Sequence, residues 1–341
     1  YKRLLFPSLE RQIRAQLTER ADAQAIGVFS ENLKNLLMQP PVKGAVTMGF
    51  DPAYRTGCKI AVVDPTGKVL DTTVVYPTPP ANRTEEAKKM LSQLIQKYGV
   101  TVIAIGNGTA SKESEIFVAQ LLGELNPKLQ RKVSYMVVSE AGASVYSASK
   151  LAAEEFPQYD VNLRSAVSIA RRLQDPLAEL VKIDPKAVGV GQYQHDMPQK
   201  RLTEALEAVV EDCVNAVGVD VNTASASLLR QVAGLHAATA QNIVTYREVH
   251  GPFTAREQLR KVPKLGPKAY QQCAGFLRVP ESSELLDHTG VHPESYEAAE
   301  RLLKKQGYKP EDIDGGKLTG LSLTIKNYIS LAEELEIGEI T

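Results

Sequence analysis

Residues 45–76 read AVTMGFDPAYRTGCKIAVVDPTGKVLDTTVVY, and this stretch decides the fold. Apolar runs rich in valine and isoleucine cover 45–51, 58–64 and 68–76, which predicts three consecutive strands. The residues Asp64-Pro-Thr-Gly67 suit a tight turn between the last two of them. We therefore expect these strands to form an antiparallel meander.

An alternation of helices and strands follows the meander. The pattern predicts a helix over 84–98 that ends at Gly99, a strand over 100–106, a helix including 114–122 and a strand over 133–139. A glycine-rich turn, GNGTAS, follows the first of these two strands. Three meandering strands followed by alternating helices and strands is the order of RNase H-like domains.

Helical patterns surround this α/β region. The 341 residues are 43% hydrophobic and 23% charged, and no apolar run reaches the roughly 20 residues of a membrane span. We expect a multidomain, mainly α protein with one α/β domain. The divisions we predict are a helical segment that ends an N-terminal helical domain (1–43), an RNase H-like mixed sheet (44–175), a helical connector (176–217), paired helical hairpins (218–280) and a small acidic helical domain (281–341).

Two turns of similar composition lie thirty residues apart in the paired hairpins. Helix-forming sequence flanks both turns, Thr254 and Glu257 match a capping box, and Pro267 suits the first position of an exit helix. A helix start exposes unpaired N–H groups, and glycine lets a phosphate approach them. The predicted contact residues are Gly234, Leu235, His236 and Ala237 in the first turn and Lys264, Leu265, Gly266 and Lys268 in the second.

Charge is distributed unevenly although the whole chain is neutral. Residues 219–280 contain eight Lys or Arg and three Asp or Glu, a net charge of +5, whereas 281–341 contain six and thirteen, a net charge of −7. A basic module favours a polyanion as its ligand. Backbone amides and lysines do not read bases, so we expect binding that is independent of sequence and weakened by salt.

The two turns resemble the helix-hairpin-helix family, whose hairpin has the pattern hxhGhGxxxA. His236 replaces the second glycine of the first turn, which is followed by Ala240 at the expected spacing. Lys264 replaces the first glycine of the second turn, and Ala269 falls one position early. The alternative for each turn is an ordinary helical hairpin with glycine in its loop.

Asp51 ends the first predicted strand, where RNase H-like nucleases hold their first metal-binding carboxylate. Glu140 follows the strand over 133–139 and is a candidate for a second. The resemblance to YqgF-type and Holliday-junction resolvase proteins implies a third carboxylate at the start of a later helix, but Ser165 stands there. Asp160 and Asp175 are candidate substitutes at other spacings. A Mg²⁺-dependent nuclease or junction resolvase using Asp51 and Glu140 is thus the alternative function.

The whole chain is similar to the Tex family of bacterial transcription accessory proteins. The likeness rests on GFDPAYRTG, GNGTASKESE, GQYQHDM and the hairpin lead-in VDVNTAS. It implies a cytoplasmic protein that binds the backbone of DNA or RNA near the transcription machinery. It implies no catalysed reaction, no cofactor and no membrane association. Complete members have a larger N-terminal helical region and a C-terminal OB-fold that binds RNA. An adaptor that mainly contacts other proteins is a further alternative.

The three cysteines predict no metal site. Cys58, Cys213 and Cys273 are scattered and lack the spacing of zinc ligands. We expect buried thiols in a reducing compartment.

Overall fold

The computed structural model describes residues 1–314, 317–318, 321 and 328–338. It contains two compact units, Tyr1–Val210 and Glu211–Thr341, and the boundary between them falls within helix α8. The first unit contains α1 (Leu5–Leu37), β1 (Thr47–Asp51), β2 (Cys58–Val63), β3 (Val69–Val75), α2 (Thr84–Tyr98), β4 (Val102–Gly106), α3 (Ser111–Leu125), η1 (Asn126–Lys128), β5 (Ser134–Val138), α4 (Ala143–Ser147), α5 (Lys150–Glu155), α6 (Val161–Gln174), α7 (Pro176–Leu180), η2 (Pro185–Val188), η3 (Gln194–Asp196) and the start of α8 (Gln199–Val217).

A five-stranded mixed sheet in the order β3-β2-β1-β4-β5 forms the centre of this unit. The pairs β1–β2 and β2–β3 are antiparallel, while β4 and β5 run parallel to β1. The predicted turn is present, because the N–H of Gly67 donates to the carbonyl of Asp64 at 2.9 Å. The meander and the RNase H-like order are therefore confirmed.

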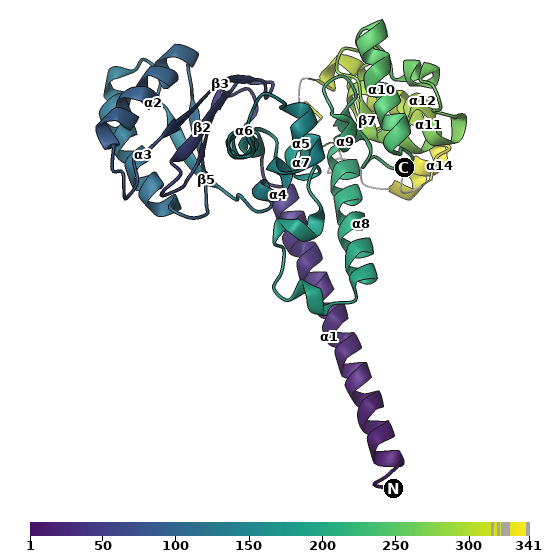
Figure 1. The fold of residues 1–341 in the computed structure, drawn as a ribbon. Helices are drawn as coiled ribbons and strands as arrows, with labels where there is room; N and C mark the ends of the chain where they lie inside the picture. Colours follow the sequence, from purple (N-terminus) through teal and green to yellow (C-terminus); the bar gives the residue numbers. More distant parts are fainter. Residues whose placement is uncertain (315–316, 319–320, 322–327, 339–341) are drawn as a thin grey trace. The chain divides into compact units, whose positions relative to one another are not determined.

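Helices cover both faces of the sheet (Figure 1). One apolar core joins the sheet to α2 and α3 and includes the fully buried Phe50, Ile60 and Leu91. On the other face, α6 packs through Ala166, Val167 and other buried residues. Because β1, β4 and β5 run parallel, their carboxyl ends lie together along one end of the sheet, the carboxyl edge, where α3 begins.

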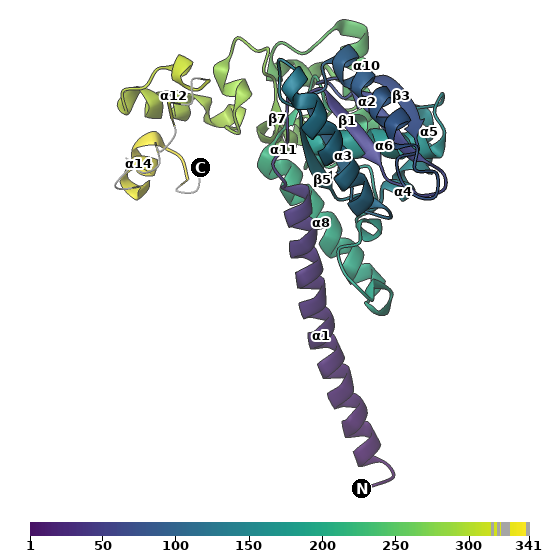
Figure 2. The ribbon, with the colours of Figure 1, turned by 90° about the vertical axis from the view of Figure 1, so that its left-hand side faces the viewer.

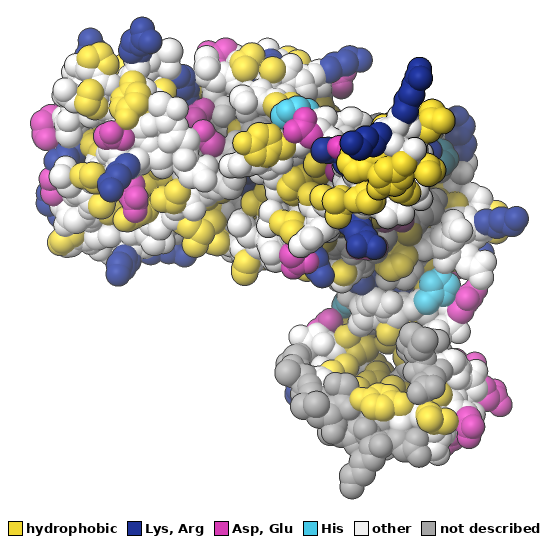
Figure 3. Space-filling view, turned by 90° about the horizontal axis from the view of Figure 1, so that it is seen from below, with side chains coloured by type: hydrophobic (Ala, Val, Ile, Leu, Met, Phe, Trp, Pro, Cys, Tyr) yellow, Lys and Arg dark blue, Asp and Glu magenta, His cyan; other side chains and the backbone are white. Residues whose placement is uncertain are grey.

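The first helix, α1, confirms that the amino-terminal segment is helical. Its second half buries Phe29 and Leu33, but its first half exposes Phe6, Leu9 and Ile13. Figure 2 shows this half extending beyond the sheet, and Figure 3, viewed toward its end, shows hydrophobic side chains in yellow there. None of the helices in the described residues is long and apolar enough to cross a bilayer.

The second unit is built from short helices. After α8 it contains β6 (Val219–Asp220), α9 (Ala226–Leu229), α10 (Ala237–His250), η4 (Arg256–Lys261), α11 (Pro267–Cys273), η5 (Ala274–Phe276), β7 (Leu277–Arg278), η6 (Leu285–His288), η7 (Pro293–Ser295), α12 (Tyr296–Lys305), η8 (Pro310–Asp312) and α14 (Tyr328–Leu335). The lead-ins of the two hairpins are joined by Asn222, whose side chain accepts from the N–H of Phe253 and donates to its carbonyl. All three cysteines are buried, as predicted, and none of them forms a disulfide with another described cysteine.

The capping box expected at Thr254 and Glu257 is absent. Thr254 instead pairs with Gln258: its N–H donates to Oε1 at 2.9 Å, and the amide group of Gln258 donates to its hydroxyl. Glu257 pairs with Arg260 at 2.7 Å. The prediction was wrong because the segment forms a 3₁₀ helix, whose tighter turn changes which side chains reach the amino terminus.

Candidate nucleic-acid interface

The first predicted turn connects α9 to α10. Gly234 adopts a φ of +82°, and His236 is the N-cap of α10. The Nδ1 atom of His236 accepts from the N–H of Thr239, while the N–H of His236 donates to the Thr239 hydroxyl at 2.9 Å. This reciprocal cap uses two amides, so a ligand would meet the amides of Ala237 and Ala238 at the helix start.

The second predicted turn connects η4 to α11 and is more open. Lys264 has a φ of +65°, Gly266 is an N-cap without any side-chain cap, and Pro267 is the first helical residue, as predicted. In the described part of the chain, the N–H groups of Gly266, Lys268 and Ala269 have no hydrogen-bond partner. A Cβ added to Gly266 would meet no atom within 4 Å. An oxyanion can therefore reach this backbone.

Leucines fix the two turns in the same conformation. The N–H of Leu235 donates to Val232 at 3.0 Å, and thirty residues later the N–H of Leu265 donates to Val262 at 3.2 Å. Leu265 is buried and Leu235 is half-buried. Both leucine amides are used within the turns, so these residues shape the backbone. Of the other predicted residues, Gly234 is half-buried and the rest are exposed.

The two hairpins differ in what surrounds the turn. A Cβ on Gly234 would lie 2.6 Å from the Cβ of Gln272, which shows that the first turn packs closely against α11. The family's alanine position is filled by Ala240 in the first hairpin and by Tyr270 in the second, and each N–H donates to its N-cap carbonyl. Both side chains are buried, and Tyr270 is tied to Glu257 at 3.1 Å.

Part of the +5 charge of the hairpins is turned inward. The guanidinium groups of Arg247 and Arg278 donate to backbone carbonyls at 2.6 Å, and Arg256 is only 1% exposed. Burial lowers the pKa of Arg247 and lowers that of Arg278 to about 10, where the charge of Arg256 contributes as well. The formal charge thus overstates what a ligand meets. The outward cations are Arg230, Arg260, Lys261, Lys264 and Lys268.

The two candidate carboxylates lie together at the carboxyl edge of the sheet. Burial raises the pKa of Asp51 to about 6; a hydrogen bond from Ser165 lowers it, and the negative charge of Glu140 raises it. The Glu140 carboxylate lies over the glycine-rich turn, because a Cβ on Gly108 would be 1.5 Å from its Oε1. The N–H of Glu140 donates to the side chain of Asn107 at 3.0 Å.

No third acid completes this pair among the described residues. Asp160 accepts from the N–H of Leu163 at 2.8 Å, and Asp175 accepts from that of Ala178 at 3.0 Å, so both carboxylates cap helices. These two candidate substitutes, which do not sit at the family's spacing, are thus both engaged at helix starts. Within the part of the chain that the structure describes, no three His, Cys, Asp or Glu side chains gather in a metal-binding arrangement.

Comparison with known proteins matches three family models. A model of the Tex protein YqgF-like domain matches residues 45–174, a helix-hairpin-helix motif matches 214–278, and an HHH domain matches 284–341. The chain is 54% identical over 313 residues to the transcriptional accessory protein Tex of Neisseria gonorrhoeae, covering 92% of this chain and 40% of that protein.

The chain belongs to the Tex family. It is also 56% identical to protein tex of Bordetella pertussis, covering 88% of this chain and 38% of the relative. Identity to the human S1 RNA-binding domain-containing protein 1 is 51%, covering 82% of this chain and 28% of the relative. The chain thus spans less than half the length of the curated relatives it matches.

The third match reveals a helix-hairpin-helix unit that sequence reasoning missed in this Tex-family chain. The available signal was Gly290-Val291-His292, which repeats the glycine, apolar residue and histidine of the first turn. His292 is again an N-cap, here of η7, and its Nε2 donates to the carbonyl of Gln271 at 2.9 Å. The acidity of the segment hid the repeat.

Arg256 occupies the acceptors of this third turn. Its Nη1 donates to the carbonyl of Val291 and the hydroxyl of Tyr296, both at 2.7 Å, and its Nη2 donates to the carbonyl of Thr289 at 2.7 Å. The N–H of Arg256 also donates to the buried carboxylate of Asp287 at 2.8 Å. Arg256 therefore holds the third turn against the rest of the second unit.

Proposed function

We propose that this part of the Tex-family protein binds the sugar-phosphate backbone of nucleic acid through its first two hairpin turns, with the second turn contributing more. Binding is independent of base sequence because the groups involved are amides and ammonium groups. The observation on which the proposal rests is the open second turn, where two exposed lysines accompany amides at Gly266, Lys268 and Ala269 that no described residue pairs with.

The contrast between the turns supports this ranking. The cap formed by His236 and Thr239 already satisfies part of the first helix start, whereas Gly266 leaves the second helix start uncapped. Lys264 and Lys268 place two cations beside the second turn, and the first turn has no cation at the equivalent positions, Gly234 and Ala238. Phosphate interactions with both amides and cations are the stronger kind.

We propose further that the RNase H-like domain is a platform that does not cleave. Two-metal phosphodiester cleavage needs carboxylates that hold both ions, and Ser165 stands where the family pattern of resolvases has the third. Asp51 and Glu140 lie together, but among the described residues no third acid joins them in a metal-binding arrangement. The alternative of a Mg²⁺-dependent nuclease has no further observation in its favour.

The role in the complete protein is also a proposal. The printed name of the gonococcal relative describes a transcriptional accessory protein, and that of the human relative describes an S1 RNA-binding domain. We infer that the hairpins hold DNA or RNA while other regions of the longer protein contact the transcription machinery in the cytoplasm. Both ligands offer the same phosphates to the turns.

The test replaces Lys264 and Lys268 by glutamine and measures fluorescence anisotropy of a labelled 20-base-pair duplex and a 20-nucleotide RNA over a range of salt. Each lysine–phosphate contact on duplex DNA contributes about 0.9 to the logarithmic salt slope, so losing two lowers the slope by about 1.8 and weakens binding about 60-fold at 0.1 M salt. An unchanged slope would refute the assignment.

A matched control replaces Lys89 and Lys112 by glutamine. Both are exposed on the RNase H-like domain and form no ion pair in the described part of the chain. The control removes the same charge, so we expect less than a threefold loss. The same samples, incubated with Mg²⁺ or Mn²⁺, report on cleavage: cutting that disappears in Asp51→Asn would overturn the platform proposal.

A further inference from the structure

Strand β5 leaves one edge of the sheet open. The N–H of Ser134 donates to Thr101 and the carbonyl of Val138 accepts from Asn107, so even-numbered residues of β5 bond to β4. By the alternation of a ladder, Tyr135 and Val137 point their N–H and carbonyl groups away from the sheet. These groups have no hydrogen-bond partner among the described residues.

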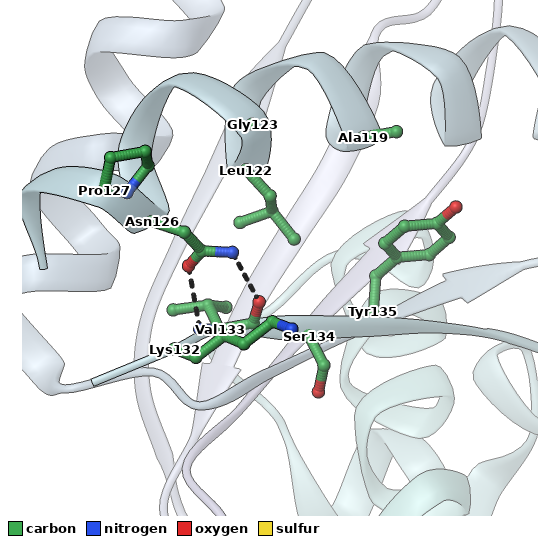
Figure 4. Close-up of a pocket in the computed structure, with 9 residues that line it drawn as sticks. All are labelled: Ala119, Leu122, Gly123, Asn126, Pro127, Lys132, Val133, Ser134 and Tyr135. Atoms are coloured by element: carbon green, nitrogen blue, oxygen red, sulfur yellow. Dashed lines mark hydrogen bonds between the residues drawn. The ribbon is translucent and has the colours of Figure 1, made fainter.

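Asn126 shows what this edge accepts. Its side chain receives a hydrogen bond from the N–H of Val133 at 2.9 Å and donates to the carbonyl of the same residue at 3.0 Å (Figure 4). Val133 is the outward residue that precedes Tyr135 in the alternation. The amide of Asn126 therefore occupies one position of an added strand, and the next two positions, at Tyr135 and Val137, are vacant.

The side chains of β5 do not protect the edge. Natural edge strands are usually blunted by charged residues, proline or bulges, but Ser134–Val138 reads SYMVV and contains none of these. Tyr135, Met136 and Val137 are 36%, 50% and 42% exposed. Residues of this kind favour pairing with another extended chain.

A groove and a basic cluster flank the open edge. The groove has a volume of about 500 Å³ and lies between α3, at Ala119 and Leu122, and β5, at Tyr135 (Figure 4). Just before β5, Lys128, Arg131 and Lys132 are all exposed and form no ion pair within the described residues. The edge thus offers amides, an apolar recess and, at one end, three unpaired cations.

We propose that this edge binds an extended segment of a partner protein, which adds to the sheet as a sixth strand. The segment has apolar side chains along its length, one of which fills the groove, and acidic side chains at the end that meets the basic cluster. Main-chain pairing at Tyr135 and Val137 supplies affinity, and the groove and charges supply specificity. The surface lies on elements that the nucleic-acid proposal does not use.

Charge favours a partner peptide over a second copy of the chain. A β5 strand paired with its own copy contains no acid to offer the cluster, and Asn126 limits such pairing to two residues of each strand. An interface of that size is far below the roughly 1,200 Å² of stable dimers. The phosphates of a nucleic acid would match the cations, but they only accept hydrogen bonds and cannot pair with the outward carbonyls of Tyr135 and Val137.

The experiment selects peptides from a phage-displayed library of random dodecapeptides on the immobilised chain, then measures a fluorescent synthetic copy of the best binder by anisotropy. Val137→Pro removes an outward N–H without touching the ladder to β4, and Val137→Thr is its matched control. We expect Val137→Pro to raise Kd at least tenfold and Val137→Thr to change it less than threefold. Circular dichroism and the protection of the β1 and β4 amides from hydrogen exchange confirm that the sheet of each variant folds.

Two further measurements test the proposal even if Val137→Pro fails to fold. The bound peptide should protect the Tyr135 and Val137 amides of the parent chain from hydrogen exchange. Arg131→Glu with Lys132→Glu should raise Kd at least fivefold at low salt, with the effect shrinking in high salt. Peptides without acidic residues, unprotected amides, or a dimer that Val137→Pro dissociates would each overturn the proposal.

Discussion

Replacing Asp51 by asparagine tests whether the sheet domain holds a carboxylate at an energetic cost. The folded pKa is about 6, against an ordinary value of 3.8, and burial is the main cause. Below pH 3.8 the Asp51 carboxyl is protonated in both the folded and the unfolded state, so it does not lower the free energy of unfolding. Between pH 3.8 and about 6 the carboxyl is ionised in the unfolded state but still protonated in the folded state, so the native state progressively loses stability as the pH rises through this window.

The expected magnitude follows from the size of this shift. About two pKa units correspond to about 3 kcal/mol, which the parent chain has lost above pH 6. Asp51→Asn removes the ionisation, so at pH 7.5 the variant should be more stable than the parent by up to about 3 kcal/mol. The gain is reduced by the lost attraction to Lys59. At pH 4 the two proteins should be nearly equal.

Hydrogen exchange of the β1 and β4 amides provides the assay, because it gives the opening free energy of the sheet itself. Asp64→Asn is a control in which the pH dependence should have the opposite sign. Burial raises the pKa of Asp64, but hydrogen bonds from Thr66 and Lys68 outweigh this and leave the pKa lowered. Its replacement should therefore destabilise the sheet at neutral pH and lose this effect in acid. A loss of stability in Asp51→Asn that is equal at pH 4 and pH 7.5 would refute the reasoning.

Four other substitutions separate the roles of structure, ligand binding and metal binding. Gly266→Ala should lower the free energy of unfolding by less than about 1 kcal/mol but weaken nucleic-acid binding, because the added methyl group meets only the ligand. Gly234 has a positive φ and a close neighbour. Gly234→Ala should therefore destabilise the hairpins by about 2–4 kcal/mol in urea unfolding. Arg256→Met should cost about 3–5 kcal/mol, since it leaves the Asp287 carboxylate buried without its cation, and hydrogen exchange should show the loss around η6 and α12. Ser165→Asp should let Mn²⁺ raise the melting temperature by a few degrees, a shift absent from the parent chain.

Features with a local cause could be predicted from the sequence. The meander follows from valine-rich runs and a turn whose Asp64 side chain accepts from the N–H of Thr66, all within a few residues. The helix that ends at Gly99 stops there because glycine adopts the left-handed conformation. The positions of both hairpin turns were also correct, because their leucines and helix starts recur at a fixed spacing.

Features that depend on distant partners could not be predicted in this way. Arg256 counts as a positive charge in the sequence, yet its partners lie more than thirty residues later. The third turn was missed because acidic composition argued against a phosphate site, and its carbonyl groups accept hydrogen bonds from Arg256 of the same unit. The open edge at β5 is visible only once the order of the strands is known.

The three turns show how one local motif acquires different roles. Each places a helix start after an apolar residue, so each could in principle bind an anion. In the third, Arg256 and Gln271 engage the turn from within the unit. In the first, a histidine caps the helix and the glycine packs against α11. Only the second combines an uncapped glycine, open space and two lysines. The motif therefore specifies a backbone conformation, and the residues around it determine whether that backbone binds a ligand or the rest of the fold.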